Sequence, residues 1–548
     1  MSAQAIATTK EAPPDPQAKA EARRRTWVLV AVCTGLIAVV ASVSGLNVAQ
    51  GQLAEQLGAT QSQLLWVING YTIALAALLL PVGAIGDRWG RKQVLLSGLT
   101  IFALANVGAA LSGTVTQLLV ARVVAGAAAA MIMPVTLSVI TSTFPEEDRD
   151  RAIGVWAGFA GAGGILGLLS SSIVVDNFTW PWVFLAPTVL ALAALVMTVV
   201  VVPRSREDHD GQFDTLGSFL SAIAVGGLVL AVHEGPEVGW TAPLTVVGLT
   251  AGILGAAWFA WWESRVENPL LDLRVFRNRS LASASIVLMV LFAMMMGLFL
   301  VIVQFLQAVL GYSAIKASLS LMPMAVVMMP LSTVAPRIAS RVGYRAMFTV
   351  GMGLFATGLA MMASMASVSG GYWSVLPGFL VLGVGMGLAQ TPATTAITAS
   401  LPVEEQGVAS ALNDTTREVG TVIGVALIGS ILSAGYSSAV SDTASALSEA
   451  AGHAVREGIG GAVYVAQEMD KAGMGAASEQ MLHAARLAFV DGWRGSMWIS
   501  VGMALAAAAF AFVWTPKRET ALAQRAEALA AAGMDDDGAL EQVVIEPA

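Results

Sequence analysis

Four ionisable side chains lie inside long apolar stretches of this sequence. Asp414, Arg417 and Glu418 share one stretch, and Arg122 lies near the end of another. Charged groups within a membrane-spanning helix are costly and rare, so these four residues are the first candidates for chemistry. Asp414 and Glu418 are spaced to share one face of a helix. A carboxylate in that position can take up a proton from one side of a membrane and release it on the other.

This cluster has two interpretations. If its helix begins near Gly407, Glu418 lies about 16 Å along it, close to the middle of a bilayer. We therefore predict that Glu418 and Asp414 carry protons and that Arg417 and Arg122 respond to their protonation. In the alternative, Arg417 pairs permanently with both acids, Arg122 anchors helix packing, and the charges only hold helices together.

A second charged group lies in the short connection Gly83–Lys92, with the sequence GAIGDRWGRK. The segment is too short to be a domain and must lie at a membrane surface. Asp87 can cap a helix N-terminus and pair with an arginine in one conformation and release both in another. We predict a conformational latch here rather than only a determinant of topology. Its predicted residues are Asp87, Arg88, Gly90, Arg91, Lys92 and, from a decayed later copy, Arg341.

The composition predicts the elements that position these groups. Hydrophobic residues make up 56% of the chain, charged residues 12%, and the mean hydropathy is +0.72, which indicates a polytopic membrane protein. A span needs roughly 20 apolar residues, and fourteen such runs are found. They lie near 27–47, 64–85, 93–112, 116–141, 152–175, 181–202, 215–233, 243–263, 281–309, 316–336, 345–366, 372–398, 408–434 and 493–515.

Several function classes lack the residues they require. The single cysteine, Cys33, excludes a disulfide framework, and the sequence has neither a phosphate-binding loop nor metal-ligand spacing. The net charge of −8 and the absence of a strongly basic region speak against nucleic acid. We expect no cofactor, no metal and no enzymatic activity.

Lysine and arginine fall in alternate connections between the spans, which predicts that both termini are cytoplasmic. The segment 435–492 is then external, and we expect a partly helical cap or hairpin there, with a ligand-binding module as the alternative. The tail after Pro516 is predicted to hold a helix at Lys517–Ala532.

An internal repeat predicts two related bundles with a substrate site between them. With an offset of 257 residues, Pro145, Ala152, Gly163, Gly167 and Gly126 fall on Pro402, Ala409, Gly420, Gly424 and Gly383; with an offset of 253, Arg88 and Gly90 fall on Arg341 and Gly343. The cavity should be mostly apolar with a few polar groups. The candidates are Asn47, Gln50, Trp66, Asn69, Tyr71, Trp156, Gln304, Gln307, Met329 and Asn413.

The pattern Gly83-x-x-x-Asp87-Arg88-x-Gly90-Arg91-Lys92 resembles the signature of the major facilitator superfamily, and Arg122-x-x-x-Gly126 is similar to its second motif. The run 411–420 resembles the penultimate span of the fourteen-span drug:proton antiporters of the EmrB/QacA type. Two features depart from that pattern: Ser42 stands where an aspartate is usual in the first span, and Ser171-Ser172 replace a glycine pair in the fifth, which also lacks the usual proline.

The resemblance implies an all-α membrane protein of fourteen transmembrane helices, with two pseudo-symmetric six-helix bundles and two extra central helices. The predicted units are a tail 1–25, bundles 26–202 and 281–515, linker helices 203–280 and a tail 516–548. It also implies a monomeric secondary transporter in a bacterial inner membrane that exports amphipathic drugs or antibiotics in exchange for protons, surrounded by lipids. The alternatives are an exporter of an endogenous lipid or secondary metabolite and a non-transporting receptor or scaffold.

Overall fold

The computed structural model describes residues 16–204 and 213–518. In this part of the chain fourteen helices are long and apolar enough to cross a membrane, which confirms the predicted fold class. The helices are α1 (Pro16–Leu57), α2 (Gln61–Trp89), α3 (Arg91–Ala110), α4 (Val115–Thr143), α5 (Glu146–Asn177), α6 (Trp182–Val201), α7 (Thr215–Val238), α8 (Pro243–Glu263), α9 (Arg279–Gln304), α10 (Ala314–Val342), α11 (Tyr344–Met365), α12 (Leu376–Thr398), α13 (Gln406–Ser445), α14 (Glu449–Glu457), α15 (Ile459–Lys471) and α16 (Gly475–Trp514).

Side-chain caps mark several helix starts that the apolar pattern alone leaves open. Thr60 and Gln63 form a reciprocal capping box at the start of α2, and the side chains of Thr114 and Ser313 cap α4 and α10. Such caps bind amide groups that a helix N-terminus otherwise leaves without partners. The caps therefore fix where each span leaves the connecting loop.

The first, thirteenth and last helices are longer than the predicted spans. α1 begins at Pro16 and continues to Leu57, and α13 and α16 have 40 residues each. A helix of that length measures about 60 Å, twice the hydrocarbon thickness of a bilayer. The predicted bounds counted only apolar residues, whereas polar residues continue these helices beyond the membrane. The predicted helix Lys517–Ala532 lies almost entirely outside the described residues.

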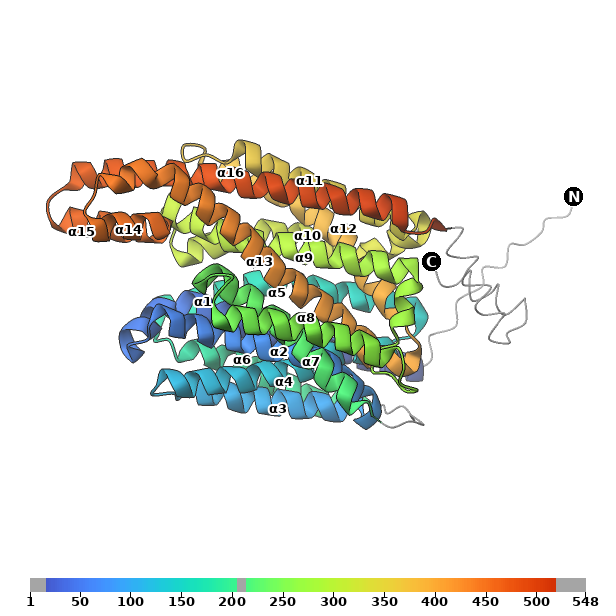
Figure 1. Cartoon of the computed structure of the whole chain (residues 1–548). Helices are drawn as coiled ribbons and strands as arrows, with labels where there is room; N and C mark the ends of the chain where they lie inside the picture. The colour runs from blue at the N-terminus through green and yellow to red at the C-terminus, as the bar shows by residue number, and fades with distance from the viewer. Residues whose placement is uncertain (1–15, 205–212, 519–548) are drawn as a thin grey trace, which may run out of the picture.

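The extensions of α13 and α16 are joined by the short helices α14 and α15, which form a helical hairpin at one end of the molecule (Figure 1). We call this the hairpin end. The opposite end holds the beginning of α1, the end of α16 and the α2–α3 connection, and we call it the latch end. The predicted hairpin in 435–492 is therefore present and is helical throughout most of its length.

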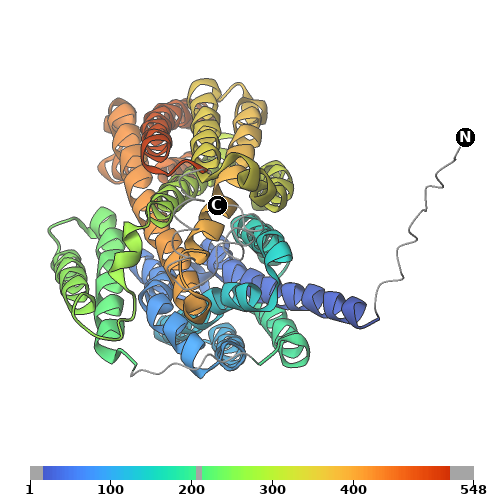
Figure 2. The same ribbon diagram turned by 90° about the vertical axis from the view of Figure 1, so that its right-hand side faces the viewer.

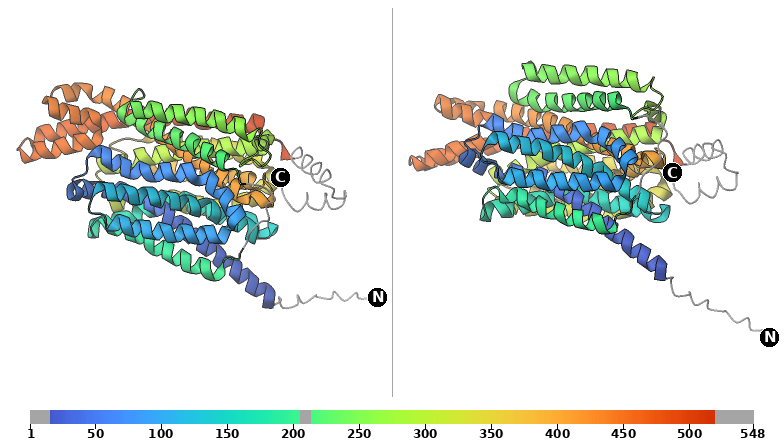
Figure 3. Two further views of the ribbon diagram at one scale, coloured as in Figure 1. Left: turned by 60° about the horizontal axis from the view of Figure 1, so that its bottom comes forward. Right: turned by 90° about the horizontal axis from the view of Figure 1, so that it is seen from below.

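The helices pack into two groups with a pair of helices beside them (Figure 2). α1–α6 contact one another extensively, as do α9–α13 and α16. α7 and α8 pack mainly on each other, and α7 also contacts α2 and α13. Two bundles and a lateral pair thus follow from the contacts, and Figure 3 shows the pair standing at the edge of the molecule.

The two bundles share backbone geometry at the positions that the repeat aligns. Gly90 joins α2 to α3 at φ +104°, and Gly343 joins α10 to α11 at φ +82°. A positive φ favours glycine, because other residues meet a steric penalty there. The two helix joints are therefore the same turn built twice.

The same correspondence holds inside the bundles. A Cβ added at Gly126 would strike the backbone carbonyl of Tyr71, and one added at Gly383 would strike that of Met324. The aligned glycines thus allow the same close approach of backbones, α4 to α2 in one bundle and α12 to α10 in the other.

Candidate functional site

The Asp87 carboxylate links the two bundles at the latch end. It is 2% exposed and accepts hydrogen bonds from the Gly407 amide at 2.9 and 2.8 Å and from the Val408 amide at 3.2 Å. Arg91 donates from Nη2 to Asp87 Oδ1 at 3.0 Å. An acid at the end of α2 therefore caps the N-terminus of α13, where unpaired amides and the helix dipole favour negative charge.

Glycines allow this contact to form. A Cβ at Gly83 would overlap the carbonyl of Gly407, and a Cβ at Gly407 would overlap the carbonyl of Gly83 and the Asp87 carboxylate. The backbones of α2 and α13 are thus in direct contact beside the cap. Any larger residue at either glycine would separate the helices that Asp87 joins.

The other predicted latch residues are divided among different contacts. The Arg88 guanidinium lies 5.7 Å from the Phe213 ring centroid, just before α7, and Lys92 donates to two carbonyl oxygens at the end of α6, within its own bundle. Arg341 is exposed at the second helix joint, at the position that the repeat aligns with Arg88. The structure places Asp87 and Arg91 in the interbundle contact and the others around it.

The ionisable cluster of α13 lies between the bundles. Asp414 is fully buried and accepts a hydrogen bond from Arg417 Nη1 at 3.2 Å and another from Asn413 Nδ2 at 3.2 Å. The Arg417 guanidinium lies 4.4 Å from the Phe292 ring centroid of α9 and 5.3 Å from that of Trp156 in α5. Residues of three helices therefore surround this ion pair.

The pairing in this cluster is incomplete. Asp414 Oδ2, Asn413 Oδ1 and Arg417 Nε are buried without a hydrogen-bond partner among the described residues. Glu418 is half-buried and interacts electrostatically with Arg417 and Asp414. Its carboxylate nevertheless has no hydrogen bond or ion pair within the described part of the chain. Arg417 is thus bound to one acid, and the second is available for another partner.

Arg122 is buried in the N-terminal bundle, with a relative exposure of 1%. It donates from Nη1 to Ser42 Oγ at 3.0 Å, and its guanidinium lies 4.2 Å from the Tyr71 ring centroid. Its Nη2 has no partner within the described residues. Ser42, at the position where the resemblance leads one to expect an aspartate, thus contacts the arginine directly but supplies no charge.

Between α5 and its neighbours α10 and α12 runs a polar seam that the sequence analysis did not single out. Gln390 of α12 donates from Nε2 to the carbonyl of Ala157 in α5 at 3.0 Å. Nearer the hairpin end, the hydroxyls of Ser172 and Ser318 lie 3.2 Å apart. Gln390 lies in a Thr-rich stretch of an otherwise apolar span. This local polarity is the sequence feature from which the seam could have been predicted.

The predicted substrate residues lie in different surroundings. Trp156 is buried and donates from Nε1 to Thr136 Oγ1 at 3.0 Å, and Met329 faces Gly158 across the seam. Gln304 and Gln307 lie at the hairpin end, in and beside a π-helical turn. Trp156, Asn413 and Met329 are thus at the bundle interface. Tyr71 and Asn69 are buried, Gln50 and Trp66 are half-buried, and the side chain of Asn47 lies outside the described residues.

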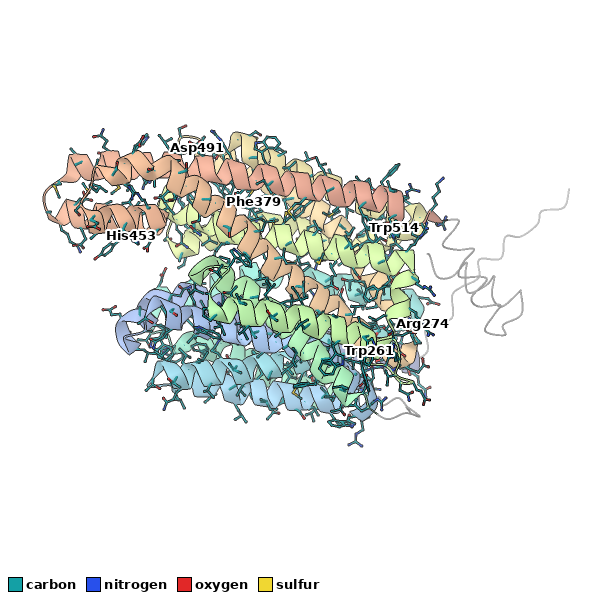
Figure 4. The ribbon with its side chains drawn as sticks, viewed as in Figure 1. Trp261, Arg274, Phe379, His453, Asp491 and Trp514 are labelled. Carbon is teal, nitrogen blue, oxygen red and sulfur yellow. The ribbon has the colours of Figure 1, made fainter. Side chains whose placement is uncertain are left out.

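Basic residues are concentrated at the latch end. Figure 4 shows Arg274, Trp261 and Trp514 at that end, and His453 on the helical hairpin at the other end. The ring of Trp514 lies 5.1 Å from the Arg279 guanidinium. Tryptophan near basic side chains is typical of a membrane–water interface.

Fourteen membrane-crossing helices in two related bundles, with charged residues buried where the bundles meet, define a membrane transporter. The model of the Major Facilitator Superfamily matches residues 30–425, and the chain belongs to that family. This membership confirms the predicted resemblance and the prediction of a transporter rather than an enzyme.

Curated relatives cover most of the chain. The "Multidrug efflux pump LfrA" of Mycolicibacterium smegmatis is 33% identical over 490 residues, which cover 88% of this chain and 95% of that protein. The "Tetracenomycin C resistance and export protein" of Streptomyces glaucescens is 34% identical over 415 residues, covering 75% and 76%. The solved structure of the proton:xylose symporter XylE matches with a TM-score of 0.58 at 13% identity, covering 91% of this chain and 97% of that one, a likeness of fold alone.

Proposed function

We propose that this protein exports amphipathic drugs or antibiotics in exchange for protons. The observation that carries the proposal is the unequal pairing of the two acids of α13: Asp414 is bonded to Arg417, and Glu418 has no fixed partner among the described residues. A carboxylate without a fixed partner can bind a proton or a substrate cation without breaking an ion pair. The names of the curated relatives support a drug or antibiotic as cargo.

Glu418 is the proposed proton carrier, and Asp414, Arg417 and Arg122 set its surroundings. Glu418 lies roughly 18 Å along α13 from Gln406, near the middle of a 30 Å hydrocarbon layer. Glu418 lies close enough to Tyr71 to interact with it electrostatically, and the Tyr71 ring in turn covers the Arg122 guanidinium. Protonation of Glu418 would therefore change the balance of charge between α13 and the N-terminal bundle.

The Asp87 cap is the proposed latch of an alternating-access cycle. In the described conformation it joins α2 to the N-terminus of α13, and we infer that this contact keeps the latch end closed. Opening that end requires the Gly407 and Val408 amides to leave the carboxylate. We infer from the concentration of basic residues there that the latch end is cytoplasmic and that both termini lie in the cytoplasm of a bacterium, with the protein in its plasma membrane.

The proposed substrate site lies at the bundle interface and includes Trp156, which is near Arg417, Met329, which packs on Gly158, and Asn413, which bonds to Asp414. It is mostly apolar, with orphaned amide and carboxylate oxygens that can accept hydrogen bonds from a ligand. Methionine adapts to ligands of different shape. A lipophilic compound with few polar groups suits this lining, and Glu418 offers one counter-charge for a monocation.

The direct test is reconstitution of the purified protein in liposomes that contain a pH-sensitive dye. A pH gradient is imposed and a panel of lipophilic cations and neutral antibiotics is added. We expect substrate-dependent proton movement in the wild type and its loss in Glu418→Gln. Glu404→Gln, which removes an exposed acid just before α13, is the matched control and should behave as wild type.

Two outcomes would contradict the proposal. Proton movement that persists in Glu418→Gln would move the coupling site elsewhere. If no compound of the panel moves protons in the wild type, drug export is wrong, and an endogenous lipid or secondary metabolite becomes the cargo to test.

A further inference from the structure

Three basic side chains gather at the end of α6 from separate segments of the chain. Arg24 of α1 donates from Nε to the carbonyl of Val201 at 3.2 Å. Lys92, at the beginning of α3, donates from Nζ to two carbonyls of the same helix end, each at 2.8 Å. Arg204 follows α6 closely in the chain and is exposed. We call Arg24, Lys92 and Arg204 the α6 corner.

Positive charge exceeds negative charge at this corner in the part of the chain that the structure describes. Arg24 and Arg204 both lie close enough to Lys92 to repel it electrostatically. Within the described residues no acid forms an ion pair with any of the three; the nearby Glu21 pairs with Arg25 instead, at 3.7 Å. The helix end supplies only about half a negative charge. Among the described residues the corner is therefore short of an anion.

Hydrogen-bond donors remain free for that anion. Arg24 uses Nε for the carbonyl of Val201, and the described part of the chain gives its two Nη groups no partner. Lys92 has three donors and two carbonyl partners. A phosphate group can accept from several such donors at once.

The surface beside the corner is apolar and faces outward. Val200 is 75% exposed, Val196 64% and Trp27 47%. Figure 3 shows the first part of α1 splaying away from the bundle beside α6, which leaves an angle between the two helices at the latch end. Acyl chains can follow the exposed valines of α6 while a headgroup lies at the corner.

We propose that the α6 corner binds the phosphate of an anionic phospholipid. The exposed apolar residues beside the cations, Val196, Val200 and Trp27, favour a lipid over a soluble anion. Acyl chains can pack on these side chains, whereas a soluble anion makes no favourable contact with them. The proposal rests on the protein's position in a membrane and not on the identity of its cargo.

Native mass spectrometry of the purified protein, titrated with phosphatidylglycerol or phosphatidylcholine, tests this proposal. The variant Arg24→Gln/Lys92→Gln/Arg204→Gln removes the corner. The control Arg265→Gln/Arg274→Gln/Arg277→Gln removes three exposed charges from the latch end on the side of α8 and α9. We expect wild type and control to bind phosphatidylglycerol alike and the corner variant to bind it roughly tenfold more weakly, since each basic residue contributes to anionic-lipid binding.

A second variant guards against misfolding. Arg24→Gln/Arg204→Gln leaves Lys92 on the carbonyls of α6, so the helix end stays capped, and it should still lose most of the phosphatidylglycerol preference. Equal binding by the wild type and both corner variants would overturn the proposal. So would equal affinity for phosphatidylcholine, which would assign binding to the acyl chains, or full competition by soluble glycerol phosphate, which would indicate a soluble anion.

Discussion

At the residue scale, the buried acids Asp87 and Asp414 differ in how completely they are hydrogen-bonded. Asp87 has all its oxygen atoms engaged, by the Gly407 and Val408 amides and by Arg91. Asp414 keeps one oxygen without a partner in the described structure. A fully satisfied carboxylate suits a contact that must hold one state, whereas an incompletely satisfied one suits a site whose partners change.

The first prediction concerns the latch. Asp87→Asn should shift the protein toward opening at the latch end, because a charged hydrogen bond contributes roughly 1.5–3 kcal/mol and the Arg91 pair is lost as well. The shift should be about tenfold or more in population. Spin labels on Trp89→Cys and Glu404→Cys, in a Cys33→Ala background, report the separation of α2 and α13. Glu147→Gln, an exposed acid at the same end, should leave it unchanged; an unchanged distance in Asp87→Asn would show that the cap does not hold this end.

The second prediction concerns the buried pair. Arg417→Met should destabilise the protein by roughly 3–5 kcal/mol, since it leaves the Asp414 charge buried without its partner. The double variant Asp414→Leu/Arg417→Met should recover most of that loss, because both charges are then absent. Thermal unfolding in detergent measures both. If the double variant is as unstable as Arg417→Met alone, packing of Arg417 on Phe292 and Trp156 matters more than the pair.

At the element scale, α5 and α10 supply one of the surfaces on which the bundles meet. α5 is continuous and has no proline, whereas α10 contains Pro323, Pro330 and Pro336. The proline expected in the fifth span is thus absent, and the prolines of α10 are the positions at which a helix of this interface can bend. Glycines of α5 let the two backbones approach closely.

This contact gives the third prediction, with a control one turn away. A Cβ at Gly154 would lie 2.5 Å from the Ser332 carbonyl oxygen, whereas at Gly158 the nearest atom is 3.7 Å away. Gly154→Ala should therefore cost about 1–3 kcal/mol by overpacking and slow transport, and Gly158→Ala should change little. Thermal unfolding and liposome transport measure the two. Equal effects of both substitutions would mean that the seam has room to adjust.

At the scale of the whole molecule, the two halves are alike in backbone and unlike in charge. The repeat aligns Asp87 with Ser340 and Gly407 with Asp150. At the first joint the acid lies on α2 and faces the amides of α13. At the related joint a serine stands at the end of α10, and the acid, Asp150, lies across from it at the beginning of α5. Among the described residues the joint at Asp87 carries the acid-to-amide cap, and we propose that opening of the latch end depends on it.

The fourth prediction concerns the helical hairpin, which stands beyond the membrane-crossing part of the molecule (Figure 1). Replacing residues 446–481 with a short Gly-Ser linker should leave transport within about twofold of wild type, because the hairpin packs on α13 and α16 and not on the bundle interface. Liposome transport measures this. Complete loss of transport by a folded variant would instead show that the hairpin takes part in the transport cycle. Its contact with the π-helical turn at the end of α9 would then be the first to test.

The sequence by itself determined the fourteen spans, the halves and the chemistry available to them, because apolar run length, glycine spacing and buried charge are local properties of the chain. That Asp87 caps a helix N-terminus was predictable, because an acid beside a joint between two helices is well placed to bind free amides. Its partners were not, because Gly407 lies 320 positions away and only packing brings it there. The different roles of Asp414 and Glu418 were not predictable either, because the two acids share one helix face and look equivalent in the sequence. Only the tertiary structure shows that Arg417 bonds to Asp414. Gln390, the α6 corner and the length of α13 beyond the membrane likewise depend on contacts between distant segments.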